Sequence, residues 1–279
     1  MPTICSSVAR FNRARMVNFV LAASIAASMP AHSQNQWPRT KDGKPDLTGI
    51  WQVLDTSLDW DIQAHAAQAG PVPELGAEFA VPPGIGAVES GEIPYLPQAL
   101  AKKKENFQKR LTEDPEIKCY MPGVPRATYM AYPFQIEQSS EYLMIAYEYA
   151  SSLRTIHMDK PGPNPAGDSW MGWSVGHWEG DTLVVDVTGM NDQTWFDRAG
   201  NYHSNELHVI ERYTPKSAEV LNYEATIEDP QVFSRPWKIS VPLYRHIEKN
   251  FQLMEYKCVP FAEDVLYGPY RRHAASSQK

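Results

Sequence analysis

The sequence is poor in cysteine and in the motifs that bind common cofactors. Only 3 of its 279 residues are cysteines. It has no GxGxxG turn opening a helix, no Walker loop, no GxSxG elbow, no HExxH helix and no EF-hand loop. These absences leave standard nucleotide and flavin binding without support, and we expect no cofactor.

Positive charge is also in deficit. The chain has 26 Lys and Arg against 33 Asp and Glu, a formal net charge of −7. The first 33 residues hold three of the arginines and no acid, so the rest of the chain carries −10. No block of Lys and Arg is interleaved with aromatic residues. Because an acidic surface repels phosphate backbones, we exclude nucleic acid as a partner.

Long apolar runs are absent except near the N-terminus. Residues 16–27 (MVNFVLAASIAA) are almost wholly apolar, but about a dozen residues fall short of the roughly 20 that a membrane-spanning helix needs. Three arginines precede this run, and Ala31 and Ser33 stand where a signal peptidase needs small residues. We therefore expect residues 1–33 to be a cleaved signal peptide rather than a membrane anchor, with Met16 as an alternative start.

Such a signal predicts a periplasmic or secreted protein that has no membrane span after cleavage. Two cysteines remain in the exported chain, Cys119 and Cys258. An even pair in an oxidising compartment favours one disulfide over two buried thiols. Neither cysteine has a neighbouring Cys or His in the sequence, which argues against a zinc site.

The rest of the chain changes character near residue 130. Residues 34–130 are rich in Pro, Gly and Ala and predict an extended arm, irregular at 68–97. Within this arm, residues 98–112 combine strong helix formers with spaced apolar residues, which predicts one helix. Residues 131–279 instead alternate short β-rich runs with turns and predict a β-domain.

The β-domain is expected to contain about eight or nine strands joined mostly by short links. The expected strands are residues 134–138, 142–149, 153–159, 173–179, 182–188, 207–214, 220–227, 237–244 and 251–258, with residues 46–53 as a short strand in the arm. Such strands form an antiparallel meander, and closure into a lipocalin-like barrel leaves few bare edges. The expected fold class is therefore mainly β, with a two-sheet sandwich as the alternative.

The longest link inside the sheet, residues 189–205, is rich in polar and aromatic residues, and long loops in compact domains are often functional. A carboxylate beside a histidine orients the ring and raises its basicity. We expect His203 to act as a general acid or base oriented by Asp197, with Trp195 and Tyr202 contacting the substrate. The alternative is a structural hydrogen bond that fixes the loop.

A second group of candidate residues lies on the predicted strands. Alternation places Arg154 and His157 on opposite faces of one strand, and an arginine inside a barrel would stabilise a developing oxyanion. We expect Tyr147, His157, His177 and Glu211 to contact the substrate. For Arg154 the alternative is a salt bridge at the rim, and for His177 it is an ordinary structural role.

Histidines on three different elements raise the question of a metal. His157, His177 and His203 could converge inside a barrel and supply three ligands. Their spacing in the sequence gives no sign that they converge. We therefore predict no metal.

Several different motifs along the chain together resemble a large family of exported, mostly uncharacterised bacterial proteins. The motifs are PDLTGIW at 45–51, the segment 114–126 from Asp-Pro to Arg126, GHWEGDTLVVD at 176–186, TWFD at 194–197, HSNEL at 203–207, Glu-Arg at 211–212, Asp-Pro at 229–230 and Pro-Trp at 236–237. The resemblance implies export and a single mature unit. It implies no activity, and residues 259–279 depart from the family pattern.

The combined expectation is a cofactor-independent acid–base enzyme of the lyase, isomerase or hydrolase type. It would act on a small apolar or aromatic molecule, because the chain is rich in aromatics, with 8 Trp and 14 Tyr. The alternative is a periplasmic binding or carrier protein for a hydrophobic small molecule, and a structural envelope component is a third. A small molecule is the expected partner in the first two cases, and a homo-oligomer is left open.

Overall fold

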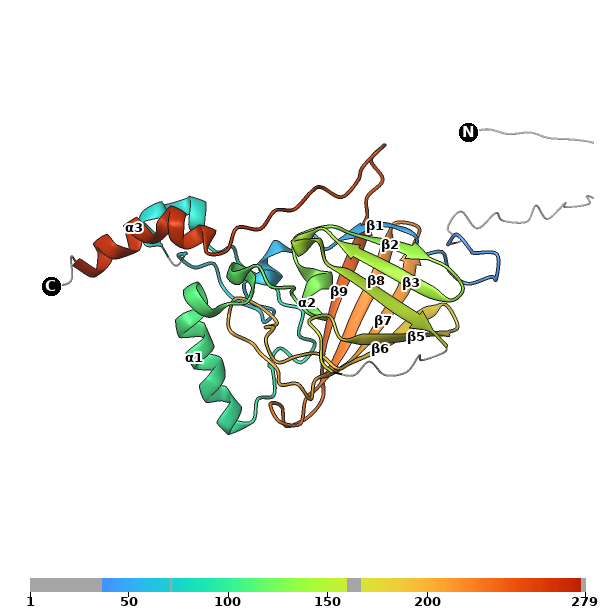
Figure 1. Ribbon diagram of the computed structural model, residues 1–279, viewed down its shortest axis with the longest axis horizontal. Helices are drawn as coiled ribbons and strands as arrows, with labels where there is room; N and C mark the ends of the chain where they lie inside the picture. The colour runs from blue at the N-terminus through green and yellow to red at the C-terminus, as the bar shows by residue number, and fades with distance from the viewer. Residues whose placement is uncertain (1–36, 71, 160–166, 277–279) are drawn as a thin grey trace, which may run out of the picture. The chain divides into compact units, whose positions relative to one another are not determined.

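Nine strands hydrogen-bond to their neighbours in sequence order and close into a barrel (Figure 1). The structure is a computed structural model that describes residues 37–70, 72–159 and 167–276, so the expected signal peptide lies outside the described residues. The strands are β1 (Gly49–Gln52), β2 (Phe134–Gln138), β3 (Tyr142–Tyr147), β4 (Leu153–Met158), β5 (Trp173–Glu179), β6 (Thr182–Thr188), β7 (His208–Ser217), β8 (Val220–Glu228) and β9 (Trp237–Arg245). The prediction of a mainly β barrel is confirmed.

The strand that closes the barrel is not the one expected. β1 pairs with β2 on one side and with β9 on the other, so a strand of the predicted N-terminal arm completes the sheet. The expected strand at residues 251–258 is wrong, because these residues have no strand structure. Once β1 lies between β2 and β9, no sheet edge is left for a further strand to pair with.

One strand pair breaks the antiparallel meander. β4 and β5 run parallel, with Ile156 opposite Ser174 and Met158 opposite Gly176. Two consecutive strands that run parallel need a connection of about a dozen residues or more, and the stretch 159–172 between β4 and β5 has the required length. The prediction of a purely antiparallel sheet is therefore wrong at this one junction, and the barrel is mixed.

Alternating side chains fill the inside of the barrel. Along β8 every second residue is buried, from Leu221 through Tyr223 and Ala225 to Ile227, and β9 alternates in the same way. The residues between them face outward. Fully burying one large apolar side chain stabilises a fold by about 1.5–3 kcal/mol. The period-2 pattern of the sequence thus fixes which face of each strand forms the core.

The helices lie outside the sheet. The predicted helix at 98–112 is confirmed as α1 (Pro97–Glu113), which ends at Asp114 before a proline. Gly200, at φ +81°, lets the long loop meet α1, because a Cβ there would lie 2.6 Å from the backbone nitrogen of Phe107. The other helical elements are α2 (Arg126–Tyr129), α3 (Ala262–Ser276) and the 3₁₀ turns η1 (Thr56–Asp59), η2 (Pro73–Phe79), η3 (Glu116–Lys118) and η4 (Tyr149–Ser151).

After β9 the chain runs as an extended segment, drawn in orange to red in Figure 1, until α3 begins. A disulfide joins Cys119 to Cys258, as predicted, and ties this segment to the connector after α1. Within the described ranges, no helix is both long and apolar enough to cross a membrane.

Candidate functional site

Two predicted site residues meet inside the barrel. Arg154 of β4 and Glu211 of β7 form an ion pair whose side chains are 1% and 0% exposed. Arg154 Nε also donates to Ser174 Oγ at 2.8 Å. The hydroxyls of Tyr213 and Tyr223 donate to Glu211 Oε1 at 3.1 and 2.8 Å. This pair therefore lies in the core and not at the rim, and its carboxylate is already bonded on both oxygens.

Tyr147 belongs to the same interior cluster. Its hydroxyl lies 3.5 Å from the hydroxyl of Thr128 in α2. Burial raises the pKa of Tyr147, and the positive charge of Arg154 opposes that rise. α2 thus contacts the interior polar cluster through Thr128, while the side chain of Arg126 makes its contacts in a second cluster described below.

His203 is buried in the long loop and both of its ring nitrogens have partners. Nδ1 lies 2.8 Å from the backbone oxygen of Ser204, to which it donates. Nε2 is left to accept from the hydroxyl of Thr194, at 2.6 Å. Burial lowers the pKa of His203, although the bond to Ser204 and the charges of Asp229 and Asp192 oppose the shift. The ring is therefore neutral and held in place.

Asp197 lies in the same loop but does not contact His203. Its Oδ2 accepts from the backbone nitrogen of Ile62 at 3.0 Å and from Asn201 Nδ2 at 2.6 Å, and its Oδ1 accepts from Asn201 N at 3.2 Å. Burial raises the pKa of Asp197 to about 7, the charge of Asp61 adds to the rise, and these hydrogen bonds oppose it. The expected pairing of Asp197 with His203 is not formed.

The remaining predicted residues lie apart from that interior cluster. Trp195 and Tyr202 face each other in a β-bridge within the long loop. His157 stacks on Trp173 with ring centroids 4.2 Å apart. His177 is exposed and lies 3.3 Å from Glu179. The structure therefore brings together Arg154, Glu211 and Tyr147 but not the whole predicted set.

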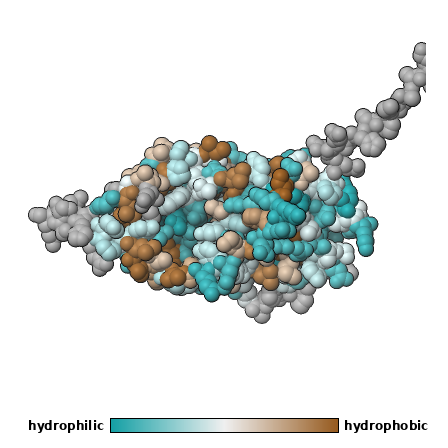
Figure 2. All heavy atoms as spheres, turned by 90° about the horizontal axis from the view of Figure 1, so that it is seen from above, coloured by the Kyte–Doolittle hydropathy of each residue, from teal (hydrophilic) through white to brown (hydrophobic). Residues whose placement is uncertain are grey.

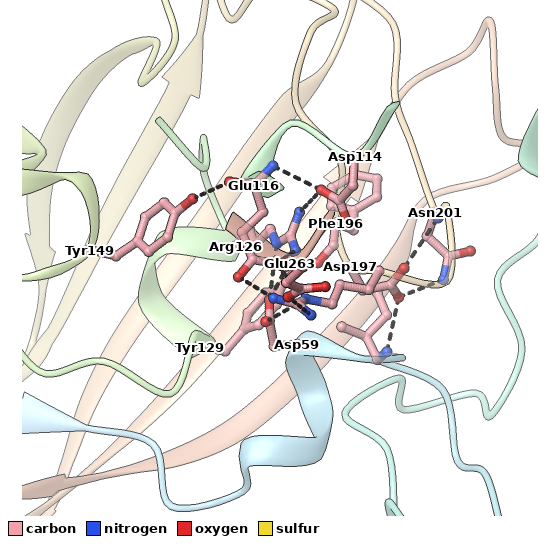
Figure 3. A network of polar contacts seen from close by, with 12 residues as sticks. Asp59, Asp114, Glu116, Arg126, Tyr129, Tyr149, Phe196, Asp197, Asn201 and Glu263 are labelled. Atoms are coloured by element: carbon pink, nitrogen blue, oxygen red, sulfur yellow. Dashed lines mark hydrogen bonds and ion pairs between the residues drawn. The ribbon is translucent and has the colours of Figure 1, made fainter. Parts of the chain in front are cut away.

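A second charged cluster, which the sequence did not single out, is built around Arg126 of α2 (Figure 3). This guanidinium is 2% exposed and contacts three carboxylates. Nη2 donates to Asp59 at 3.0 Å and to Glu116 at 2.8 Å, and Nη1 donates to Asp114 at 3.2 Å. Asp59 ends η1, and Glu116 begins η3, so α2 is fixed to two neighbouring turns at once.

Arg198 of the long loop joins the same cluster. It binds Glu116 through two nitrogens, with Nε 2.7 Å from Oε2 and Nη2 2.8 Å from Oε1. Its Nη1 lies 3.0 Å from Glu263 of α3, and its Nε lies 3.5 Å from Asp59. The cluster therefore contains two arginines and four carboxyl groups, and it joins five segments of the chain.

The cluster has more carboxyl groups than arginines, and the pKa values of Asp59 and Glu116 shift in opposite directions. Burial raises the pKa of Asp59 to about 6, the charge of Glu116 adds to the rise, and Arg126 and Arg198 oppose it. Burial also acts to raise the pKa of Glu116, but Arg198, Arg126 and a hydrogen bond with Asp59 outweigh it and lower the pKa to about 2. Below about pH 6 Asp59 therefore carries a proton while the Glu116 carboxylate stays ionised. Carboxyl pairs whose pKa values are pushed apart are characteristic of acid–base sites.

A pocket of about 290 Å³ opens beside this cluster. Glu116, Arg198 and Glu263 form its polar wall. The rings of Tyr132 and Tyr256, with centroids 5.2 Å apart, form an aromatic wall. The remaining lining residues are Ile117, Lys257, Cys258, Val259 and Ala262. A small, partly apolar molecule that carries one polar group matches this lining.

The signals for this cluster are weak in the sequence. Asp114 and Arg126 stand at the two ends of one of the motifs named above. Arg198 directly follows Asp197 in the long loop that was predicted to be functional. No pattern in the sequence joins Asp59 to Glu116, because the residues between them include an irregular stretch and a whole helix. Only the fold brings their carboxyl groups together.

Within residues 37–70, 72–159 and 167–276, no group of three or more His, Cys, Asp or Glu side chains is arranged to hold a metal ion. Comparison with protein-family models, with curated proteins and with solved structures finds no match for this chain. Its function is therefore inferred from its own residues.

Proposed function

We propose that the protein is an acid–base enzyme whose reacting centre is the pair Asp59–Glu116 beside the 290 Å³ pocket. The observation that carries the proposal is the split between the two carboxyl groups, with a pKa of about 6 for Asp59 and about 2 for Glu116. A group with a pKa near the working pH can both donate and regain a proton during turnover. His203 is a weaker candidate, because both of its nitrogens already have partners.

Each residue of the site has a role that follows from its position. Glu116 lines the pocket and accepts a hydrogen bond from the protonated Asp59, so it connects Asp59 to a bound molecule. Arg198 also lines the pocket, and its charge would stabilise an oxyanion that develops there. Tyr132 and Tyr256 would pack against an aromatic ring. The reaction class is a lyase, isomerase or hydrolase acting on a small apolar or aromatic molecule, with no nucleotide cofactor.

The second candidate is a carrier for a hydrophobic small molecule. It is favoured by the apolar part of the same pocket, where Val259 and Ala262 lie beside the tyrosine rings. In that case the charged cluster would only hold the surrounding turns together. For either function we propose action in the periplasm or outside the cell, because residues 1–33 have the pattern of a signal peptide and the chain contains a disulfide.

The proposal is tested by replacing Asp59 with Asn. An asparagine can place its oxygen toward Arg126 and its amide toward Glu116, so Asp59→Asn imitates the protonated acid but cannot release the proton. We expect it to slow turnover by on the order of 100-fold or more. The probes are deuterium exchange into phenylacetone in D₂O, followed by proton NMR, and hydrolysis of 4-nitrophenyl acetate.

The matched control is Asp181→Asn, which alters an exposed acid paired with Arg39 far along the chain from the site. This variant should react like the wild type. Full activity in Asp59→Asn on a probe that the wild type converts would refute the catalytic role of Asp59. Retention of phenylacetone by the wild type, measured by equilibrium dialysis and without any exchange or hydrolysis, would favour the carrier.

A further inference from the structure

One wall of the pocket belongs to a chain segment that has no regular structure of its own. Tyr256, Lys257, Cys258 and Val259 line the pocket, and all four lie in residues 246–261, here called the C-terminal segment. No residue of this segment is in a helix or a strand, and a turn lies near each of its ends. Its position therefore depends on contacts with other elements and not on an internal hydrogen-bond ladder.

Few polar contacts hold the C-terminal segment near the pocket. The backbone nitrogen of Met254 donates to Glu148 at 2.8 Å, and that of Phe261 donates to the oxygen of Ile117 at 2.8 Å. The ring of Tyr256 packs against those of Tyr132 and Tyr149, which adds a contact with the body of the fold. Each of the two hydrogen bonds contributes about 1 kcal/mol.

Burial of apolar side chains contributes little to keeping the C-terminal segment in this position. Ile247, Met254 and Val259 are 70%, 73% and 64% exposed, so their transfer from water stabilises the bound position only slightly. Figure 2 views the molecule from the side on which this segment lies in Figure 1, and apolar patches stand on that face among polar ones. The disulfide is a covalent cross-link between the C-terminal segment and the connector after α1.

Neither cysteine of the disulfide is fully buried. Cys119 and Cys258 are partly exposed. Cys258 lines the pocket, and Cys119 closes η3, the turn that begins with Glu116. The bond therefore joins this wall of the pocket to the turn that carries its central carboxylate.

We propose that the Cys119–Cys258 disulfide is a redox latch on the pocket. When oxidised, it holds the C-terminal segment as the pocket wall, and when reduced by a dithiol it releases that wall and opens the pocket. A reductant thiolate attacks one sulfur and the S–S bond breaks. The second reductant thiol then displaces the mixed disulfide, so Cys119 and Cys258 gain two electrons and two protons while the dithiol becomes a cyclic disulfide.

The latch shares its pocket with the proposed function but not its chemistry. The barrel closes through hydrogen bonds between its nine strands, and the disulfide lies outside that sheet. Reduction should therefore free the C-terminal segment while the barrel stays folded. A test that reads the position of the segment without any substrate keeps this proposal separate from the role of Asp59.

Limited digestion of the full chain with trypsin provides that test. Lys249 and Lys257 are exposed residues of the C-terminal segment, and cleavage needs several neighbouring residues to leave the surface. With dithiothreitol we expect cleavage at Lys257 to become at least about tenfold faster, because local opening controls the rate. The double variant Cys119→Ser, Cys258→Ser should be cleaved at the fast rate with or without dithiothreitol. Samples are quenched, fully reduced and analysed by mass spectrometry.

Circular dichroism of the same samples serves as the control for folding. An unchanged β-sheet signal together with faster cleavage supports the latch. Equal cleavage rates in the oxidised chain, the reduced chain and the double variant would overturn it. Loss of the β-sheet signal on reduction would also overturn it, because the bond would then stabilise the whole fold and not one segment.

Discussion

At the scale of single residues, Arg126 organises the charged cluster. Its guanidinium is buried among Asp59, Asp114 and Glu116. Removing one partner of a buried ion pair leaves the others uncompensated, which is strongly destabilising. Arg126 is therefore as important to the fold as to the proposed site. A neutral replacement would change both stability and activity, so the free energy of unfolding of such a variant has to be measured directly.

We expect Arg126→Met to lower the free energy of unfolding by about 3–5 kcal/mol, measured by urea denaturation. Arg39→Met is the matched control, because it removes an arginine whose ion pair with Asp181 is exposed, and its midpoint should stay close to that of the wild type. Similar midpoints for both variants would show that the buried cluster does not stabilise the fold.

The hydrogen-bond partners of buried residues were the hardest feature to predict from the sequence. His203 and Asp197 are close in the chain, and that closeness suggested a pair. In the folded loop His203 is bound by Thr194 and Ser204, and Asp197 is bound by Asn201 and Ile62. Nearness along the sequence does not decide which hydrogen-bond partners a buried group finds, because backbone groups from distant segments compete for it.

At the scale of elements, the strands were largely predictable and the closure was not. The period-2 burial of β7, β8 and β9 is a direct consequence of alternating apolar residues. The position of β1 between β2 and β9 depends on a pairing over a long stretch of chain, which local patterns do not encode. α3 was missed for a different reason, since Gly268 and Pro269 in its sequence are local signals against a helix.

The pair Arg154–Glu211 ties β4 to β7 across the interior of the barrel. We expect Arg154→Met to cost about 3–5 kcal/mol of unfolding free energy, because Glu211 would remain buried and charged without its partner. The double variant Arg154→Met, Glu211→Leu should recover much of that loss, because it leaves no uncompensated charge. Thermal and urea unfolding of both variants provide the measurement. A double variant less stable than Arg154→Met alone would show that the tyrosine hydroxyls, and not the charge, decide the cost.

At the scale of the whole molecule, the charged cluster connects protonation to folding. Asp59 has a pKa of about 6 in the folded protein, above the value near 3.9 of an unfolded chain. Between these two pH values the folded state holds a proton that the unfolded state has lost, so folding is favoured at low pH and this contribution disappears as the pH rises through about 6. Glu116 acts in the opposite sense, since its pKa is lowered to about 2 and its contribution is lost only as the pH falls toward that value.

The most direct test is the unfolding free energy of the wild type and of Asp59→Asn as a function of pH, from urea denaturation between about pH 3 and pH 8. The Asn variant keeps the bonding pattern of the protonated acid at every pH, so the difference between the two curves isolates the proton on Asp59. We expect the wild type to lose on the order of 2–3 kcal/mol relative to the variant as the pH rises from about 4 to about 6, with a constant difference on either side. Parallel curves across that range would contradict the claim that Asp59 holds the proton of an acid–base pair.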